Sequence, residues 1–325
     1  MASGLELHSD RAALPFTGPW LLAPMEGVTD ACFRDLVLER NSADQLGGAF
    51  TEFARVVDHP LPTRILRRHL GERRFRTPVG LQLMGHDLDA LAATAARAVE
   101  AGAPIVDLNF GCPAKGALRT CAGSALLRDP QRLEEVVRTC VAAVDGGVPV
   151  SAKIRAGYDD ADTVEDLARA AESGGAALLT IHCRTRKEHY QPTVDWSRVA
   201  RAVDAITIPV CGNGGAAKHA DLERMRAETG CDYVMVGHAA LADPWVFSGH
   251  EVTTAEAARF LTDYAEAMQT MNGVRPRGAV SRIKQLLRHW TAGGLVRDEV
   301  HRTEWLREQD PEALLARLAA LCDAD

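Results

Sequence analysis

A regular alternation of short apolar runs with helix-forming stretches is the feature of this 325-residue sequence that most restricts its fold. Each run is followed by polar residues and then by a stretch with helical periodicity. The runs are WLLAP, GGAFTEF, PVGLQLM, PIVDLNF, PVSAKIR, ALLTIHC, TIPVCGN and DYVMVG. Eight such units over about 240 residues predict an α/β fold of the (β/α)8 TIM-barrel type, with an open doubly wound sheet as the alternative.

The sequence changes character after residue 250, where no strand-like run remains. The remaining stretches with helical patterns are TAEAARFLTDYAEAMQTM, GAVSRIKQLLRHWTAG, RDEVHRTEWLRE and DPEALLARLAALCDA. Caps and apolar spacing of this kind are typical of helices that pack on one another. We therefore predict a barrel domain over residues 1–248, followed by a C-terminal all-helical domain, a helical bundle, over residues 249–325.

The composition is that of an ordinary soluble protein. Hydrophobic residues make up 46% of the chain and charged residues 25%, and no run approaches the ~18 apolar residues that span a bilayer. The N-terminal segment lacks the basic start and apolar centre of a signal peptide. We expect a cytoplasmic protein that does not bind a membrane. Because the sequence has no heptad pattern, we also expect a monomer. The cysteines form no CxxC pair and no cluster with metal-ligand spacing, so no metal is expected.

The charge is distributed unevenly along the chain. A formal net charge of −7 disfavours a general binder of polyanions. Two segments are nevertheless strongly basic: RILRRHLGERRFR at 64–76 and RPRGAVSRIKQLLRH at 275–289. Such runs are commonly solvated faces, and they are also the electrostatic footprint of a nucleic-acid binder, so both interpretations stay open at this point.

Polar residues end nearly every predicted strand of the barrel. Catalytic groups of such barrels come from the carboxyl ends of the strands, so these residues are candidates for an active site. They are Glu26, Glu52, Gln82, Asn109, Cys112, Lys153, Arg155, His182, Arg184, Asn213 and Gly237. Each alone has a structural explanation, such as a hydrogen-bonded core histidine. Their joint occurrence predicts a functional site at the mouth of the barrel.

Glycine-containing segments end the last two predicted strands. CGNGG and VMVGH place glycine where backbone N–H groups can approach a ligand, and the corresponding loops of these barrels commonly hold a phosphate. Tight turns need glycine as well, so each motif alone is weak. Lys153 and Arg155 are two apart on one strand and share one face, which adds positive charge at the mouth. Together these features favour a phosphorylated cofactor.

Two cysteines follow the fourth predicted strand. Cys112 lies between Gly111 and Pro113, a loop position that can hold an exposed and oriented thiol, with Lys153, Arg155 and His182 expected on neighbouring strands. Cys121 has no evident ionic neighbour. Because acid or nucleophilic chemistry depends on a controlled thiol environment, Cys112 is favoured over Cys121, although position alone decides neither.

The ordered motifs resemble those of the tRNA-dihydrouridine synthase family. They are APMEGVTD at 23–30, TEFARVVDH at 51–59, LQLMG at 81–85, DLNFGCP at 107–113, AKIRAG at 152–157, IHCRT at 181–185, GNGG at 212–215 and VMVG at 234–237. The resemblance spans nearly the whole predicted barrel, and NxGCP followed by GS at 123–124 is highly specific. MEGV, TEFxRVVD and the later RIKQ look most like the bacterial C-type members, which act on uridine 16 of the tRNA D-loop; uridine 20 is the alternative.

The resemblance implies a flavoenzyme that holds FMN at the barrel mouth and tRNA with the help of the helical domain. NADPH reduces the flavin, a hydride passes to C6 of an extruded uracil, and a cysteine, here Cys112, protonates C5; Cys121 matches no catalytic position. The implied FMN contacts are Ala23, Pro24, Met25, Gln82, Lys153, His182, Asn213, Gly214, Gly237 and His238. The implied tRNA contacts are Asn109, Arg155, Arg184, Tyr190, Arg282 and Lys284.

One position departs from the family pattern, which usually has arginine where this chain has His238. We expect little effect if the backbone at this position is what contacts the phosphate.

Two other functions remain to be weighed. One is an FMN barrel that reduces a free pyrimidine or a small enone, which the helical domain and the basic segments disfavour. The other is a tRNA-binding factor without redox activity, which intact Cys112, Asn109, Lys153 and His182 disfavour.

Overall fold

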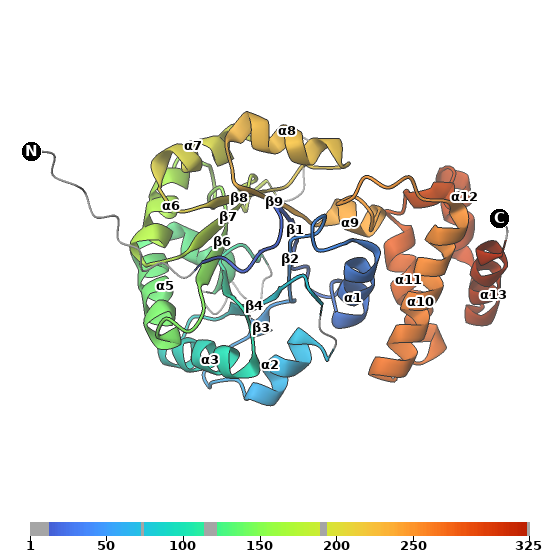
Figure 1. Ribbon diagram of the computed structural model, residues 1–325, viewed down its shortest axis with the longest axis horizontal. Coiled ribbons are helices and arrows are strands. Elements are labelled where there is room, and N and C mark those ends of the chain that lie inside the picture. The colour runs from blue at the N-terminus through green and yellow to red at the C-terminus, as the bar shows by residue number, and fades with distance from the viewer. Residues whose placement is uncertain (1–12, 73–74, 114–121, 189–193, 324–325) are drawn as a thin grey trace, which may run out of the picture.

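Eight parallel strands close into a barrel in the computed structural model, which describes residues 13–72, 75–113, 122–188 and 194–323 (Figure 1). Around the ring the order is β1, β2, β4, β5, β6, β7, β8 and β9, and β9 pairs with β1. The bounds are β1 Trp20–Leu22, β2 Gly48–Phe50, β4 Val79–Met84, β5 Val106–Asn109, β6 Val150–Arg155, β7 Leu178–His182, β8 Val210–Asn213 and β9 Tyr233–Val236, and a short β3, Ala54–Arg55, pairs with the end of β4. The predicted TIM barrel is confirmed, and the open sheet is excluded.

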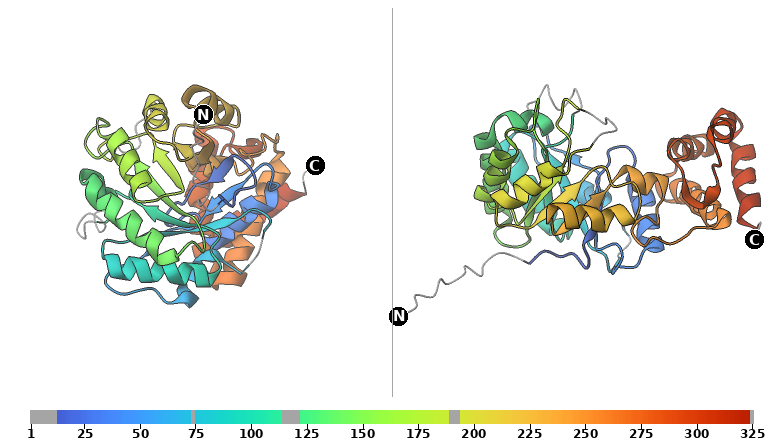
Figure 2. Two further views of the ribbon diagram at one scale, coloured as in Figure 1. Left: turned by 60° about the vertical axis from the view of Figure 1, so that its left-hand side comes forward. Right: turned by 90° about the horizontal axis from the view of Figure 1, so that it is seen from above.

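Helices cover the outside of the barrel between successive strands (Figures 1 and 2). Those described are α1 Ala31–Arg40, α2 Thr63–Leu70, α3 Leu88–Ala101, α5 Pro130–Val144, α6 Val164–Ser173, α7 Ser197–Ala205, α8 Ala220–Thr229 and α9 His238–Ala242, with a 3-10 turn at Gly123–Arg128. Aspartates fix several helix starts, because a side-chain oxygen accepts a free N–H of the first turn. Asp30, Asp87 and Asp129 do so for α1, α3 and α5.

The barrel interior is apolar at one end and polar at the other. Side chains alternate across each strand, so every second residue points inward. Leu21, Phe50, Ile105, Leu178 and Met235 pack into one buried cluster with their inward-facing neighbours. Further along the same strands the interior becomes polar, and this places ionisable groups at the carboxyl end of the barrel.

The last part of the chain is helical, as predicted, and lies to one side of the barrel (Figure 2). Its helices are α10 Thr254–Asn272, α11 Pro276–Leu287, α12 Glu299–Arg307 and α13 Pro311–Cys322, with a 3-10 turn at Ala292–Gly294. Phe260, Trp290 and Trp305 are fully buried among them. The proposed boundary at residues 248 and 249 falls between α9 and α10, and the division into two domains there remains a prediction.

Contacts with α1 join the helical part to the barrel. Phe33 of α1 packs edge-on against Phe260 and Tyr264 of α10, with ring centroids 5.8 and 5.9 Å apart. Asp30, at the start of α1, accepts from Arg282 of α11 at 2.8 Å and from the Tyr264 hydroxyl at 3.2 Å. The helical part is thus fixed against the loop that leaves β1. Across the described stretches of the chain, no helix combines the length and the apolarity that crossing a membrane requires.

Candidate active site

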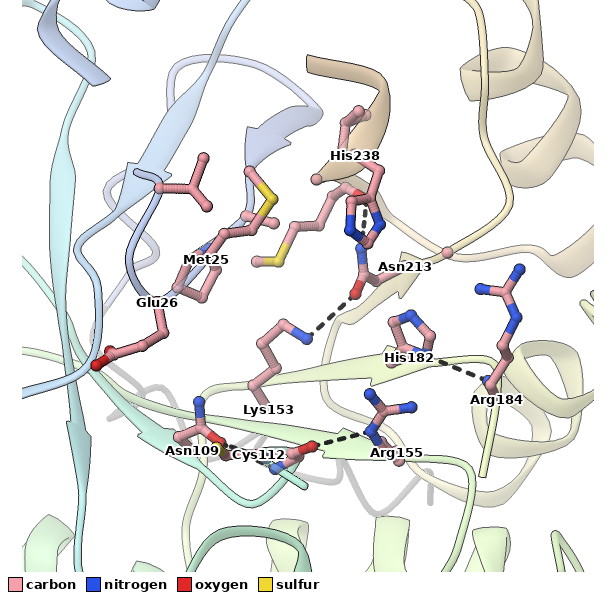
Figure 3. Close-up of a pocket in the computed structure, with 18 of the residues that line it drawn as sticks. Met25, Glu26, Asn109, Cys112, Lys153, Arg155, His182, Arg184, Asn213 and His238 are labelled. Atoms are coloured by element: carbon pink, nitrogen blue, oxygen red, sulfur yellow. Dashed lines mark hydrogen bonds between the residues drawn. The ribbon is translucent and has the colours of Figure 1, made fainter. Parts of the chain in front are cut away.

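A cavity of about 310 Å³ opens at the carboxyl ends of the barrel strands, where the sequence predicts the active site (Figure 3). Most of the predicted site residues line it, although they come from six different strands and the loops that follow them. They are Ala23, Pro24, Met25, Asn109, Cys112, Lys153, Arg155, His182, Arg184, Asn213, Gly214, Gly237 and His238. Glu26, a candidate from the strand-end pattern, also lines the cavity.

The loop that carries Cys112 follows β5 directly and is held from two sides. Asn109 Oδ1 accepts from the backbone N–H groups of Gly111 at 3.0 Å and Cys112 at 2.9 Å. The Cys112 carbonyl accepts from the N–H of Ser124 at 3.1 Å. Gly123 has a φ of +58°, and a Cβ there would lie 2.9 Å from that carbonyl oxygen. Glycine at position 123 therefore lets the loop hold the Cys112 thiol, half-buried, at the cavity wall.

Arg155 connects the Cys112 loop to the loop that follows β7. Its Nε donates to the Gly111 carbonyl at 2.9 Å, and its Nη1 donates to the Thr185 carbonyl at 3.2 Å. The residue is only 3% exposed and still lines the cavity. Its guanidinium thus positions two loops, and its charge lies beside the cavity.

Lys153 lies near the centre of the site, and its ammonium points toward Asn213 (Figure 3). Its Nζ donates to Asn213 Oδ1 at 3.1 Å, while Asn213 Nδ2 donates to the Met235 carbonyl at 2.7 Å. The amide of Asn213 is therefore fixed with its oxygen toward the lysine. Burial, followed by the nearby charge of Arg155, lowers the pKa of the Lys153 ammonium. A lysine in this state can donate hydrogen bonds to an electron-rich ligand atom.

The remaining ionisable groups leave the cavity with an excess of positive charge. Burial and the charges of Lys153, Arg155 and Arg184 hold the pKa of His182 well below its ordinary value, so its imidazole is neutral at neutral pH. Of the lining residues that the structure describes, Glu26 is the only carboxylate, and burial raises its pKa. The site is therefore suited to an anionic ligand.

Glycine backbone forms the rim next to His182 and His238. Gly214 has a φ of +104°, and a Cβ there would lie 2.9 Å from Cys183 Sγ and 3.2 Å from His182 Nε2. A Cβ on Gly237 would lie 3.2 Å from Met25 Sδ. These side-chain-free positions leave backbone open to the cavity, as close approach by a phosphorylated ligand requires.

Three predicted site residues do not line the cavity. Gln82 is fully buried beneath it, between Asp107 and Asn109. Arg282 pairs with Asp30 and donates to the Gly27 carbonyl, so it holds α11 against the barrel. The Nζ of Lys284 donates to the carbonyls at the end of α12, including that of Leu306 at 3.0 Å. Tyr190 and Cys121 lie outside the described residues.

Sequence reasoning assigned no role to Asp107 or Ser151, which lie under the site. Both are fully buried, and Ser151 Oγ donates to Asp107 Oδ1 at 2.7 Å. The alternation of side chains along a strand could have indicated them. Asp107 lies on the same strand face as Asn109, and Ser151 lies on the same face as Lys153. Phe53, from the TEF motif, was also given no role, and it lines the cavity near Cys112.

A second cavity, of about 470 Å³, lies beside the first, between the start of α1, helix α2 and the loop before α11. Glu52, another strand-end candidate, lines it together with Arg34 and Arg68. Burial raises the pKa of the Glu52 carboxyl. Arg68 is exposed, as are Arg64 and Arg67 on the same helix. Arg64, Arg67 and Arg68, from the basic segment found in the sequence, therefore form an exposed arginine face on α2.

The closed barrel, the thiol-bearing loop and the cationic, glycine-rimmed cavity together define a barrel enzyme that acts with an anionic cofactor or substrate. The family model described as dihydrouridine synthase (Dus) matches residues 21–311. A tRNA-dihydrouridine(16) synthase of Cupriavidus necator is 41% identical over 231 residues, which cover 69% of this chain and 71% of the relative. Relatives of the same name from Aquipseudomonas alcaligenes and Haemophilus influenzae are 35% and 34% identical, covering 82% and 83% of this chain and 88% and 89% of theirs.

The chain belongs to the dihydrouridine synthase family. It is an oxidoreductase of the kind that carries out flavin-dependent reduction of uridine in tRNA. The resemblance found in the sequence motifs is thereby confirmed, as is the expected enzyme class.

Proposed function

We propose that the protein binds FMN in the 310 Å³ cavity, takes electrons from NADPH, and reduces uridine 16 of the tRNA D-loop to 5,6-dihydrouridine. The observation that carries this proposal is the place of Cys112, a half-buried thiol on the wall of a cationic cavity with a glycine rim. Position 16 rests on the names of the relatives and on the C-type motifs, and uridine 20 is the alternative.

The residues present fit FMN. Gly214 and Gly237 line the cavity with backbone that carries no side chain, as a phosphate needs, and a Cβ at Gly214 would press on His182, another lining residue. Lys153, Asn213 and His182 provide donors and acceptors for the polar edge of a flavin, and Ala23, Pro24 and Met25 offer an apolar surface for the ring. Gln82 lies beneath the cavity with Asn109 between it and a bound flavin. Its amide nitrogen and oxygen both have protein partners, Asp107 and Asn109.

Reduction of the 5,6 double bond needs one hydride and one proton. When bound, the flavin would supply the hydride to C6 of the uracil. Cys112 holds the proton: its loop presents the thiol at the cavity wall, and we assign it the donation to C5. The thiolate that this leaves lies in a cavity with Lys153 and Arg155, whose positive charges stabilise it until it regains a proton from solvent.

Recognition of tRNA uses surfaces on both parts of the chain. A base inside a folded RNA must leave its stack to reach the cavity, and Arg184 at its edge is suited to the extruded nucleotide or its phosphates. The exposed arginines of α2 offer further positive charge for RNA phosphates. We assign the protein to the cytoplasm, where it acts as a monomer on tRNA. On the helical part, Arg282 and Lys284 fix α11 and α12 and remain the proposed tRNA contacts.

The test is the visible spectrum of the purified protein under anaerobic conditions. We expect a flavin spectrum that NADPH bleaches and that tRNA lacking dihydrouridine restores. Restoration by free uridine at a similar rate would favour the small-substrate reductase, and RNA binding without any bleaching would favour a tRNA-binding factor. In Cys112→Ala we expect flavin and bleaching to persist while restoration is lost; loss of flavin would give Cys112 a structural role. Mapping of dihydrouridine in tRNA from a deletion strain decides between positions 16 and 20.

A further inference from the structure

A continuous chain of side-chain hydrogen bonds runs beneath the Cys112 loop. Ser151 Oγ donates to Asp107 Oδ1 at 2.7 Å, and Gln82 Nε2 donates to Asp107 Oδ2 at 2.7 Å. Asn109 Nδ2 then donates to Gln82 Oε1, also at 2.7 Å. The Asn109 oxygen accepts the two N–H groups of the loop, those of Gly111 and Cys112. We call Ser151, Asp107, Gln82 and Asn109 the amide relay.

The strands place these side chains in contact. Gln82 on β4 and Ser151 on β6 are the register partners of Asp107 on β5, one on each side. Asn109 lies two residues further along β5 and so points to the same interior. Gln82, Asp107 and Ser151 are all fully buried, so water does not compete for their hydrogen bonds.

The carboxylate of Asp107 determines which atom donates in each of the following hydrogen bonds of the amide relay. An ionised carboxylate can only accept, so Gln82 must turn its amino group toward Asp107. Its oxygen then faces Asn109, which must donate with its own amino group. The Asn109 oxygen is left facing the loop, the only orientation that can accept from two backbone N–H groups.

We propose that Asp107 is a positioning residue for the reaction: by fixing the orientation of the Gln82 and Asn109 amides, it sets where the Cys112 thiol lies. This inference rests on the proposed role of Cys112 as proton donor. A reversed amide relay would point the Asn109 amino group at two N–H groups with no acceptor among them, and the loop would have to move. The reduction of the flavin by NADPH, which needs no thiol, would be unaffected.

Four variants test this direction-setting role. Ser151→Ala leaves the carboxylate, so the amide relay keeps its direction. Asp107→Asn can also keep it, because its oxygen can face Gln82 while its amino group donates to the Ser151 hydroxyl. In the double variant Asp107→Asn/Ser151→Ala, that amino group has no acceptor at position 151, so the amide relay loses its anchor at this end and residue 107 no longer fixes its direction. Gln82→Met, which keeps the length of the side chain and removes both hydrogen bonds, breaks it outright.

The measurements are flavin content, the rate of flavin reduction by NADPH, the rate of reoxidation by tRNA, and the alkylation rate of Cys112 followed by peptide mass spectrometry. For Ser151→Ala and for Asp107→Asn we expect reoxidation within about threefold of wild type, and for the double variant a loss of about tenfold or more, because contacting residues are non-additive and small displacements are costly in catalysis. Gln82→Met should resemble the double variant. Cys112 alkylation should change in these two proteins, and the double variant should keep its flavin content and reduction rate.

The outcomes separate this inference from the proposed function. If wild-type reduced flavin is not reoxidised by tRNA, the proposed function fails. If wild type is reoxidised and the double variant behaves as the product of the two single variants, with unchanged Cys112 alkylation, the inference alone is overturned. Loss of flavin from Gln82→Met with normal reoxidation of the flavin that remains would also overturn it, and would make Gln82 a cofactor contact instead.

Discussion

Replacing Gly123 by alanine tests whether the position of Cys112 depends on one missing side chain. The added Cβ would lie 2.9 Å from the Cys112 carbonyl oxygen, 3.2 Å from the Cys112 Cβ and 3.3 Å from Met84 Sδ. The first of these contacts is with backbone, so the loop itself must shift. The φ of +58° also places the alanine in the left-handed region.

Two costs set the expected magnitude. Left-handed backbone costs alanine about 1–2 kcal/mol, and the lower entropy of the unfolded alanine chain offsets roughly 0.4–1 kcal/mol of this, so about 1 kcal/mol remains. Overpacking against the Cys112 loop adds about 1–3 kcal/mol. The free energy of unfolding should therefore fall by about 2–4 kcal/mol. The shift of the thiol should slow flavin reoxidation by tRNA by roughly 10- to 100-fold.

Gly146→Ala is the matched control. Gly146 has a φ of +71°, and no atom lies within 4 Å of the Cβ that alanine would add. It should lose only the backbone contribution of about 1 kcal/mol, with a normal rate of reoxidation. Urea unfolding and anaerobic stopped-flow absorbance measure the two quantities. Equal destabilisation of both variants, or normal reoxidation in Gly123→Ala at full flavin content, would refute the steric argument.

Three further predictions concern charge. Because His182 is buried and neutral in the native state, unfolding takes up a proton below the ordinary pKa of about 6.5. The free energy of unfolding should therefore fall by up to roughly 1.4 kcal/mol per pH unit of acidification. In urea unfolding, His182→Gln should show a weaker dependence of this free energy on pH, and an unchanged dependence would contradict a neutral His182. Replacing Arg64, Arg67 and Arg68 by alanine should raise KM for tRNA at unchanged kcat. The slope of log affinity against log salt concentration should fall by about 1 for each arginine that binds a phosphate in the wild-type complex. The exposed Arg169→Ala on α6 is the control, and equal KM values in both proteins would exclude the α2 face as a tRNA contact. Arg282→Ala should cost about 1–3 kcal/mol in thermal unfolding, since its ion pair with Asp30 is only partly exposed; no loss would mean that other contacts hold α11.

The strand pattern was sufficient to predict the barrel and most of its mouth. Asn109, Arg155, His182 and Asn213 end their strands, Lys153 lies two residues before the end of its strand, and residues at strand ends of a parallel barrel must converge. The pattern could not tell how deep each residue lies. Gln82 is the register partner of Asp107, whereas Lys153 is that of Asn109, so Gln82 sits one step below the cavity.

The helical part shows a different limit. Helical periodicity predicts which face of α11 is apolar, but it does not predict the hydrogen-bond partner of a long charged side chain on that helix. Lys284, a predicted tRNA contact, donates to backbone carbonyls at the end of α12, where the helix leaves acceptors without partners. That partner is set by the packing of α11 on α12, which depends on contacts distant in sequence.

The layers of the barrel interior explain why its cations can be concentrated at one end. Apolar side chains fill the floor, and above them burial raises the pKa of the Asp107 carboxyl to about 6, although the hydrogen bonds from Gln82 and Ser151 and the charge of Lys153 oppose this shift. Lys153, Arg155 and Arg184 then face the open cavity with no described carboxylate beside them except Glu26. A cavity built in this way leaves its upper face for an anion, and the buried carboxylate that orients the Cys112 loop lies one layer below the cations.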